Sequence, residues 1–195
     1  MHWQQRAHRR RAFNEPGHAH ELTFNCYRRF QFLKAERVCH WLADSIDDSR
    51  REHDFALWAY VFMPEHVHLL VFPRRPNYDM GQILKSIKEP VGRKAIAHLE
   101  EHASHWLPKI TVRSGTRLVR RFWQAGGGYD RNLWEYQAIL AAIEFIHQNP
   151  VRRNLIERAE DWRWSSAGWY AGIPLNSLRP DPIDFTMLPS PRRTN

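Results

Sequence analysis

The chain has 195 residues, of which 43% are hydrophobic, and a formal net charge of +8 at pH 7 with a pI near 9.9. This length suits one domain with a substantial core, and the hydrophobic content is that of a globular protein. No stretch approaches the length of a membrane span, and the N-terminus carries arginines without the apolar segment of a secretory signal, so a membrane protein is excluded and a cytoplasmic setting is expected.

The composition also narrows the class of partner. An excess of positive charge favours a polyanion, most commonly a nucleic acid. The two cysteines, Cys26 and Cys39, lack the CxxC spacing, which argues against a disulfide framework or a thiolate zinc site.

Three regions follow one another along the chain. Residues 1–17 form a basic arm, residues 18–171 a folded domain, and residues 172–195 a tail with five prolines that is either wrapped on the surface or loose. Within the domain, a short strand is expected from Ala19 to Tyr27, and apolar residues recur at helical spacing from about Phe32 to His53.

Two further strands are expected at Phe55–Phe62 and His66–Phe72, so close together that they should pair as an antiparallel hairpin. A long helix should cover Met80 to His102, with a bend or break at Pro90. A late strand is possible at Ile110–Val112, and an amphipathic helix is expected at Glu135–Gln148. This order predicts an α+β fold, an antiparallel sheet with helices on one face.

The basic residues are clustered without intervening acids, which favours a binding track for nucleic-acid phosphates over a solvated surface. Trp123 follows one cluster directly and could provide a stacking platform for an unpaired base, although some of the nine tryptophans must be core residues. The clusters comprise Arg9, Arg10 and Arg11 in the arm, then Arg113, Arg117, Arg120 and Arg121, and finally Arg152 and Arg153.

His66 and His68 are the candidate metal ligands. Side chains two apart on a strand point to the same face, so both imidazoles project together, while Val67 points to the other face. Two such imidazoles can bind a divalent cation with a third ligand from elsewhere. Taken alone the pair is a weak motif, and two half-exposed histidines on a sheet face are the simpler alternative.

The string around this pair, Tyr60-Val-Phe-Met-Pro-Glu-His-Val-His-Leu-Leu70, resembles the signature of the single-tyrosine HUH transposases, and most closely their REP-associated, insertion-sequence-200-like branch. Further likenesses lie at Phe122–Gln124, Phe145–Val151 and Asp161–Ser166. Together these motifs follow the family's order over roughly residues 19–170.

This resemblance implies a ferredoxin-like sheet and cleavage of single-stranded DNA, often beside a hairpin, with Mg²⁺ or Mn²⁺. A tyrosine hydroxyl would attack phosphorus and leave a 5′-phosphotyrosine and a free 3′-hydroxyl, so that strands can be rejoined without an external energy source. By the resemblance, His66 and His68 would ligate the cation, and Asn149 stands where the third ligand would be.

The family's nucleophilic tyrosine usually stands at the position that Phe145 occupies here, and a benzene ring has no hydroxyl. Tyr129, in Gly126-Gly-Gly-Tyr-Asp-Arg-Asn132, is the substitute we favour, because glycines let the backbone approach a phosphate. Asp130 and Arg131 could orient it, and Arg131 is also a candidate contact for the nucleic acid. The simpler alternative is a glycine-rich turn whose tyrosine packs on the sheet. Tyr136 lies about two and a half turns before Phe145 and faces differently.

Three functions therefore stay open. The first is a transposase-like endonuclease and strand transferase on single-stranded hairpin DNA, acting as a monomer or homodimer. The second is a nucleic-acid-binding protein that kept the fold but lost the nucleophile. The third is metal-dependent hydrolysis by water. His147 and Glu144 flank the expected site and are candidate accessory ligands.

Overall fold

The computed structural model describes residues 14–174 and 178–189. Four strands form its central sheet in the order β2-β3-β1-β6, and every neighbouring pair is antiparallel. The strands are β1 (Ala19–Asn25), β2 (Phe55–Met63), β3 (His66–Pro73) and β6 (Tyr129–Leu133). With α1 (Glu36–His53) after β1 and α2 (Met80–His102) after β3, the chain makes the β-α-β-β-α-β arrangement expected of a ferredoxin-like fold.

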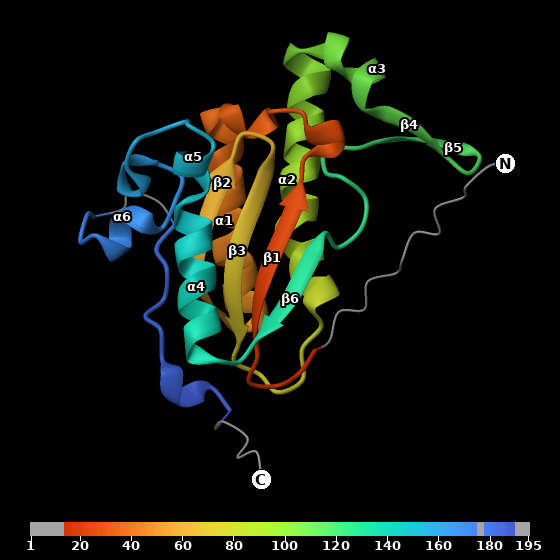
Figure 1. The fold of residues 1–195 in the computed structure, drawn as a ribbon. Helices are drawn as coiled ribbons and strands as arrows, with labels where there is room; N and C mark the ends of the chain where they lie inside the picture. The colour runs from red at the N-terminus through yellow and green to blue at the C-terminus, as the bar shows by residue number, and fades with distance from the viewer. Residues whose placement is uncertain (1–13, 175–177, 190–195) are drawn as a thin grey trace, which may run out of the picture.

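Apolar layers lie on both faces of the sheet. Val67, Leu69 and Val71 of β3 pack with residues of α1 and α2, whereas Leu70 and Phe72 point to the opposite face and pack with α4 (Tyr136–His147). Figure 1 shows α1 and α2 behind the sheet and α4 in front of it. The α+β class and the antiparallel sheet are confirmed. The placement of the helices on one face holds for α1 and α2 but is wrong for α4.

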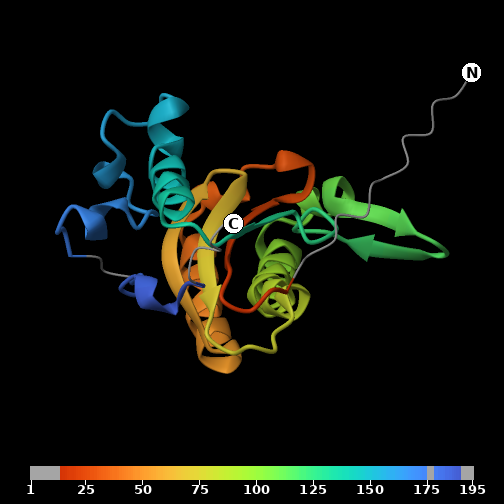
Figure 2. The ribbon, with the colours of Figure 1, turned by 60° about the horizontal axis from the view of Figure 1, so that its bottom comes forward.

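The other elements are short. The helices α3 (Leu107–Ile110), α5 (Asn149–Arg152) and α6 (Ala167–Tyr170) each span one turn. The strands β4 (Thr111–Ser114) and β5 (Arg117–Arg120) pair only with each other and project from the body as an arm (Figure 2). The late strand expected near Ile110–Val112 therefore exists as β4, outside the main sheet. The fourth strand of that sheet is β6. For this segment the sequence predicted no strand, and a glycine-rich turn was one of the two alternatives.

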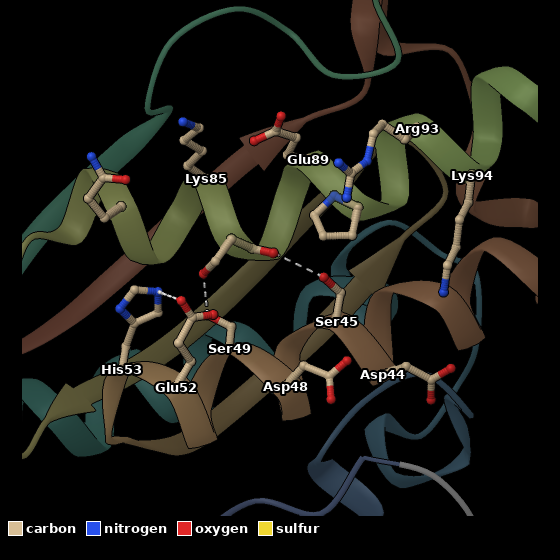
Figure 3. A pocket seen from close by; sticks show the side chains of 13 residues that line it. Asp44, Ser45, Asp48, Ser49, Glu52, His53, Lys85, Glu89, Arg93 and Lys94 are labelled. Atoms are coloured by element: carbon tan, nitrogen blue, oxygen red, sulfur yellow. Dashed lines mark hydrogen bonds and ion pairs between the residues drawn. The ribbon is translucent and has the colours of Figure 1, made fainter.

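Helix α2 continues through Pro90, so of the bend or break expected there, the break is absent. Proline has no N–H to donate to the carbonyl four residues earlier, here that of Ser86. The hydroxyl of Ser45 on α1 donates to this carbonyl at 3.2 Å and to that of Ile87 at 2.8 Å. Figure 3 shows Ser45 and Ser49 of α1 turned toward α2 along this contact. The neighbouring helix thus supplies the donor that proline removes.

The C-terminal segment packs on the body where it is described. Leu178 is buried, its carbonyl accepts a hydrogen bond from the Tyr60 hydroxyl at 2.7 Å, and Asp181 accepts one from the backbone N–H of Leu57 at 2.8 Å. Of the two alternatives for the tail, the surface-wrapped one describes this segment. Most of the N-terminal arm lies outside the described residues. Among the described helices, none combines the length and the apolar character needed to cross a membrane.

Candidate metal centre and nucleic-acid interface

His66 and His68 begin strand β3 and lie on the face that α4 covers. Their ring centroids are 4.8 Å apart, and both side chains are buried. The intervening Val67 belongs to the opposite apolar layer. The strand's period of two therefore places the two imidazoles side by side, as the sequence predicted.

Each imidazole has one ring nitrogen fixed by a neighbour. His68 Nδ1 lies 2.8 Å from the hydroxyl of Thr23 on β1, and His66 Nδ1 lies 3.1 Å from Oε1 of Glu65. Glu65 is buried and also paired with Arg153. With Nδ1 protonated and donating, Nε2 of each ring is left with a lone pair for a cation, which is the usual arrangement around metal-bound histidines.

Burial keeps both imidazoles neutral. It lowers the pKa of His68 to about 3, helped by the nearby His66 and Arg152, and it lowers the pKa of His66 as well. Burial alone would raise the pKa of Glu65, but hydrogen bonds and charge from Arg153 and His66 hold it below its ordinary value. At neutral pH the centre therefore combines two neutral nitrogen donors with an ionised carboxylate beside one of them.

The junction of α4 and α5 brings the third candidate ligand to the pair. Pro150 follows Asn149 and ends the α4 pattern, so that Asn149 opens α5 beside the sheet. The Asn149 amide nitrogen lies 3.2 Å from Nε2 of His68. A turn of this amide by half a revolution would direct its oxygen, a cation ligand, to the same place.

Phe145 stands beside the same histidine. Its ring contacts that of His68 edge to face, with centroids 5.6 Å apart, and 42% of the residue is exposed. The Arg152 guanidinium lies 4.2 Å from the centre of the Phe145 ring and donates to the Phe145 carbonyl at 2.6 Å. The position where the family's tyrosine usually stands is thus at the histidine pair and carries a stacked Phe–Arg contact.

Tyr129 lies in register with the site. On the sheet, His68 is opposite Thr23, and Thr23 is in turn opposite Tyr129. Residues paired across antiparallel strands point to the same face, so the three side chains form one row, with Cα atoms of its two ends about 10 Å apart. Tyr129 is 39% exposed. The pairing therefore brings together two residues that are 61 positions apart in the sequence.

These residues fit a divalent cation. Two imidazole nitrogens and an amide oxygen suit Mg²⁺ poorly as a complete set but suit Mn²⁺ well, and both metals complete their shells with water or phosphate oxygens. The second carboxylate oxygen of Glu65 is buried without a hydrogen-bond partner among the described residues, which adds negative potential beside the pair. Within the described ranges no three His, Cys, Asp or Glu side chains form a metal-binding group, so the amide of Asn149 is needed.

The described arginines that were predicted to contact nucleic acid fall into two groups. Arg152 and Arg153 lie beside the histidine pair through their contacts with Phe145 and Glu65, and Arg131 points from β6 to pair with Glu21 at 2.7 Å on the same face. The second group, on the projecting arm and the segment after it, comprises Arg113, Arg117, Arg120 and Arg121. Arg9, Arg10 and Arg11 lie outside the described residues.

Trp123 is mainly a core residue. It is 8% exposed, packs edge to face on Phe24, and donates its indole N–H to the Lys88 carbonyl at 2.8 Å. The interpretation of an open stacking platform is therefore wrong for the broad face of this ring, because Phe24 and α2 cover it.

One other expectation changes. His147 bonds the Ser166 hydroxyl at 2.8 Å and packs on Tyr170, so it is no accessory ligand. Tyr136 packs on Phe185 at the far end of α4 from Phe145, in agreement with the prediction that it faces differently. Sequence reasoning missed Thr23, for which no local signal exists, and Glu65, whose position directly before His66 could have suggested its role.

Comparison with known proteins assigns the chain to a family. Residues 17–114, half of the chain, match the family described as Transposase IS200 like. The chain belongs to the IS200-like transposase family. The matched residues contain β1, α1, β2, β3 and α2, and with them the histidine pair of this transposase. The resemblance seen in the sequence is confirmed.

Individual relatives agree with this assignment. A Haemophilus influenzae protein named as a REP-associated tyrosine transposase is 24% identical over 149 residues, which cover 70% of this chain and 77% of that protein. A REP-associated tyrosine transposase solved bound to a REP hairpin has the same fold, with a TM-score of 0.64 and 19% identity. That match covers 92% of this transposase and 96% of the solved chain.

Proposed function

We propose that this transposase cuts and rejoins single-stranded DNA beside a hairpin, with the Tyr129 hydroxyl as the attacking group. The row of His68, Thr23 and Tyr129 across three paired strands carries the proposal, since it places a tyrosine on the same face as the candidate ligands. The hairpin substrate is supported by the solved relative that is bound to a REP hairpin.

His66, His68 and Asn149 would hold a Mg²⁺ or Mn²⁺ ion. When bound, the ion would polarise a phosphate oxygen and neutralise charge that develops at phosphorus. Thr23 and Glu65 keep the two imidazoles oriented, and Arg152 and Arg153 provide positive charge for the DNA backbone near them.

The chemistry balances without another reactant. The Tyr129 oxygen forms a bond to phosphorus and loses its proton to solvent, while the bond from phosphorus to the 3′-oxygen breaks and that oxygen takes up a proton. The products are a 5′-phosphotyrosine and a free 3′-hydroxyl. Because the phosphodiester energy is kept in the Tyr–O–P bond, attack by a 3′-hydroxyl rejoins a strand.

A gel assay tests this proposal. Protein and Mn²⁺ are incubated with a hairpin oligonucleotide that carries unpaired flanks and a label at its 3′ end, and the products are separated under denaturing conditions. The proposal predicts a labelled protein adduct that disappears with EDTA, in Tyr129→Phe and in His68→Ala. An adduct that survives in Tyr129→Phe contradicts the assigned nucleophile, and nicking without any adduct indicates hydrolysis by water.

A second candidate is a DNA-binding protein without cleavage activity. The Phe145 ring at His68 favours it, because the usual position of the nucleophile carries no hydroxyl. This candidate predicts salt-dependent hairpin binding that His66→Ala leaves intact. It also predicts no adduct on any hairpin substrate, the opposite of the result above.

A further inference from the structure

A groove of about 590 Å³ runs between α2 and the segment that follows β5. Its lining includes five cationic side chains and one carboxylate, and although Arg120 pairs with Glu100, the remaining excess of positive charge favours a polyanion. The six charged residues are Lys85, Lys88, Glu89, Arg93, Arg120 and Arg121. None of the proposed cation ligands lines this groove.

The groove also has an apolar part of its lining, here called its floor, which comprises Leu84, Ile96, Phe122 and Trp123. Although Trp123 is only 8% exposed, it is therefore part of the surface of this groove. Gly92 lies beside the indole of Trp123, where an added Cβ would be in van der Waals contact with Cδ1 at 3.7 Å. Glycines at this and three further lining positions leave room that longer side chains would fill.

The groove continues beneath the projecting arm. A second hollow of about 500 Å³ shares Ile96 and Arg120 with the first and is also lined by Leu118 of β5. Leu118 is 70% exposed, and its register partner Arg113 on β4 points to the same side of the arm. The apolar floor and its cationic margin therefore extend from α2 onto the arm.

The other end of the groove reaches the candidate active site. Gly126 and Gly127 line the groove, and Tyr129 follows two residues later, at most about 7 Å along the backbone. At Gly128 the chain lies close against the backbone of β1, because an added Cβ would lie 2.1 Å from the Thr23 carbonyl oxygen. The glycine segment thus joins the groove to the row of Tyr129, Thr23 and His68.

We propose that this groove binds the unpaired DNA strand beside the cut site, with bases on the apolar floor and phosphates on the cationic walls. The inference rests on the proposed function and adds the path of the substrate to it. An apolar floor between cations suits a single strand, whose bases are free to leave water, whereas a duplex presents its phosphates and keeps its bases stacked inside.

Binding measured in EDTA tests the groove separately from the chemistry. Fluorescence anisotropy compares a hairpin that carries an unpaired flank with the same hairpin cut blunt. Gly127→Trp fills the floor without changing charge, and among the described residues only Leu84 lies near the added Cβ. It should weaken binding of the flanked hairpin about ten-fold, as loss of base contacts would, and change binding of the blunt hairpin less than about two-fold.

A charge variant gives a second measurement should the tryptophan variant fold poorly, which circular dichroism would show. Arg121→Ala should lower the slope of log affinity against log salt for the flanked hairpin by about 0.7, the loss of one single-strand phosphate contact. Lys94→Ala, also on α2 but facing α1, is the matched control and should leave the slope unchanged (Figure 3).

Equal affinities of wild type and both groove variants for the flanked hairpin would overturn the inference. So would an equal loss for the flanked and blunt hairpins. Because these measurements need no cation, they separate the two proposals. A wild-type protein that binds the flank through the groove yet forms no adduct with Mn²⁺ supports the groove and contradicts the proposed function.

Discussion

Phe145 is the residue at which this chain departs most clearly from the family pattern. Its ring contacts His68 and carries the Arg152 guanidinium on one side. A tyrosine in the same rotamer would extend its hydroxyl from a ring that is already at the histidine pair and 42% exposed. Position 145 thus has the contact with His68 and the exposure that a nucleophile would need, but its side chain has no hydroxyl.

Phe145→Tyr should therefore give a second route to the covalent adduct. We expect adduct formation in the double variant Phe145→Tyr/Tyr129→Phe, at or above the wild-type rate, because the new hydroxyl lies on a ring that contacts His68. The measurement is the rate of labelled adduct with Mn²⁺. Phe145→Leu in the same Tyr129→Phe background is the control, and adduct from that control would contradict this explanation.

Gly128 holds Tyr129 in register with the site. Its φ is +79°, and an added Cβ would overlap the Thr23 carbonyl. Gly128→Ala should lower the free energy of unfolding by about 2–4 kcal/mol, since overpacking adds to the strain of a left-handed conformation.

Gly126→Ala is the matched control for that variant. Gly126 has a φ of +94° but open space around it, so only the conformational strain applies, and we expect a loss of about 1 kcal/mol. Urea unfolding curves measure both values. Equal losses in the two variants would show that the close approach at Thr23 has no role.

Sequence reasoning identified the histidine pair because strand periodicity is local. The expectation that His66 and His68 share a face needs only their spacing of two. Their partner Thr23 depends on the register between β1 and β3, which is set by pairing across more than 40 residues. No pattern within one segment carries that information.

Elements were predictable where an apolar pattern was strong. The β2–β3 hairpin and the long helix α2 follow from such patterns. Strand β6 was not recognised because it is a short edge strand, Tyr-Asp-Arg-Asn-Leu, in which only Leu133 is buried. The apolar stripe of α4 predicted that one side of this helix is buried. Such a stripe does not determine which face of the sheet the helix covers.

The contact of Ser45 with α2 explains why Pro90 is tolerated, and a double-mutant cycle tests it. Ser45→Ala should cost about 1–2 kcal/mol of unfolding free energy, because the Ser86 carbonyl loses the donor that replaces the missing N–H of Pro90 and the Ile87 carbonyl loses a second hydrogen bond. In a Pro90→Ala background, where the new backbone N–H can donate to the Ser86 carbonyl, the same change should cost about 0.5–1 kcal/mol less. Additive effects of the two substitutions would contradict the compensating role of Ser45.

The sheet separates two surfaces that the proposed reaction uses together. The α4 face holds the histidine pair, Asn149 and Tyr129, while the groove with its cationic walls lies on the α2 side. The glycine segment before β6 joins them. The net charge predicted a nucleic-acid partner, but the division of its arginines between two surfaces depends on the folded topology and could not be predicted from their clustering.

Identification of the attached residue is the most direct test of this account. The adduct formed with Mn²⁺ and a flanked hairpin is digested with protease and nuclease, and the peptide that carries the nucleotide is sequenced by tandem mass spectrometry. We expect a nucleotide on Tyr129, bound through its 5′-phosphate. Attachment to any other residue, or cleavage of the DNA with no modified peptide, would contradict it.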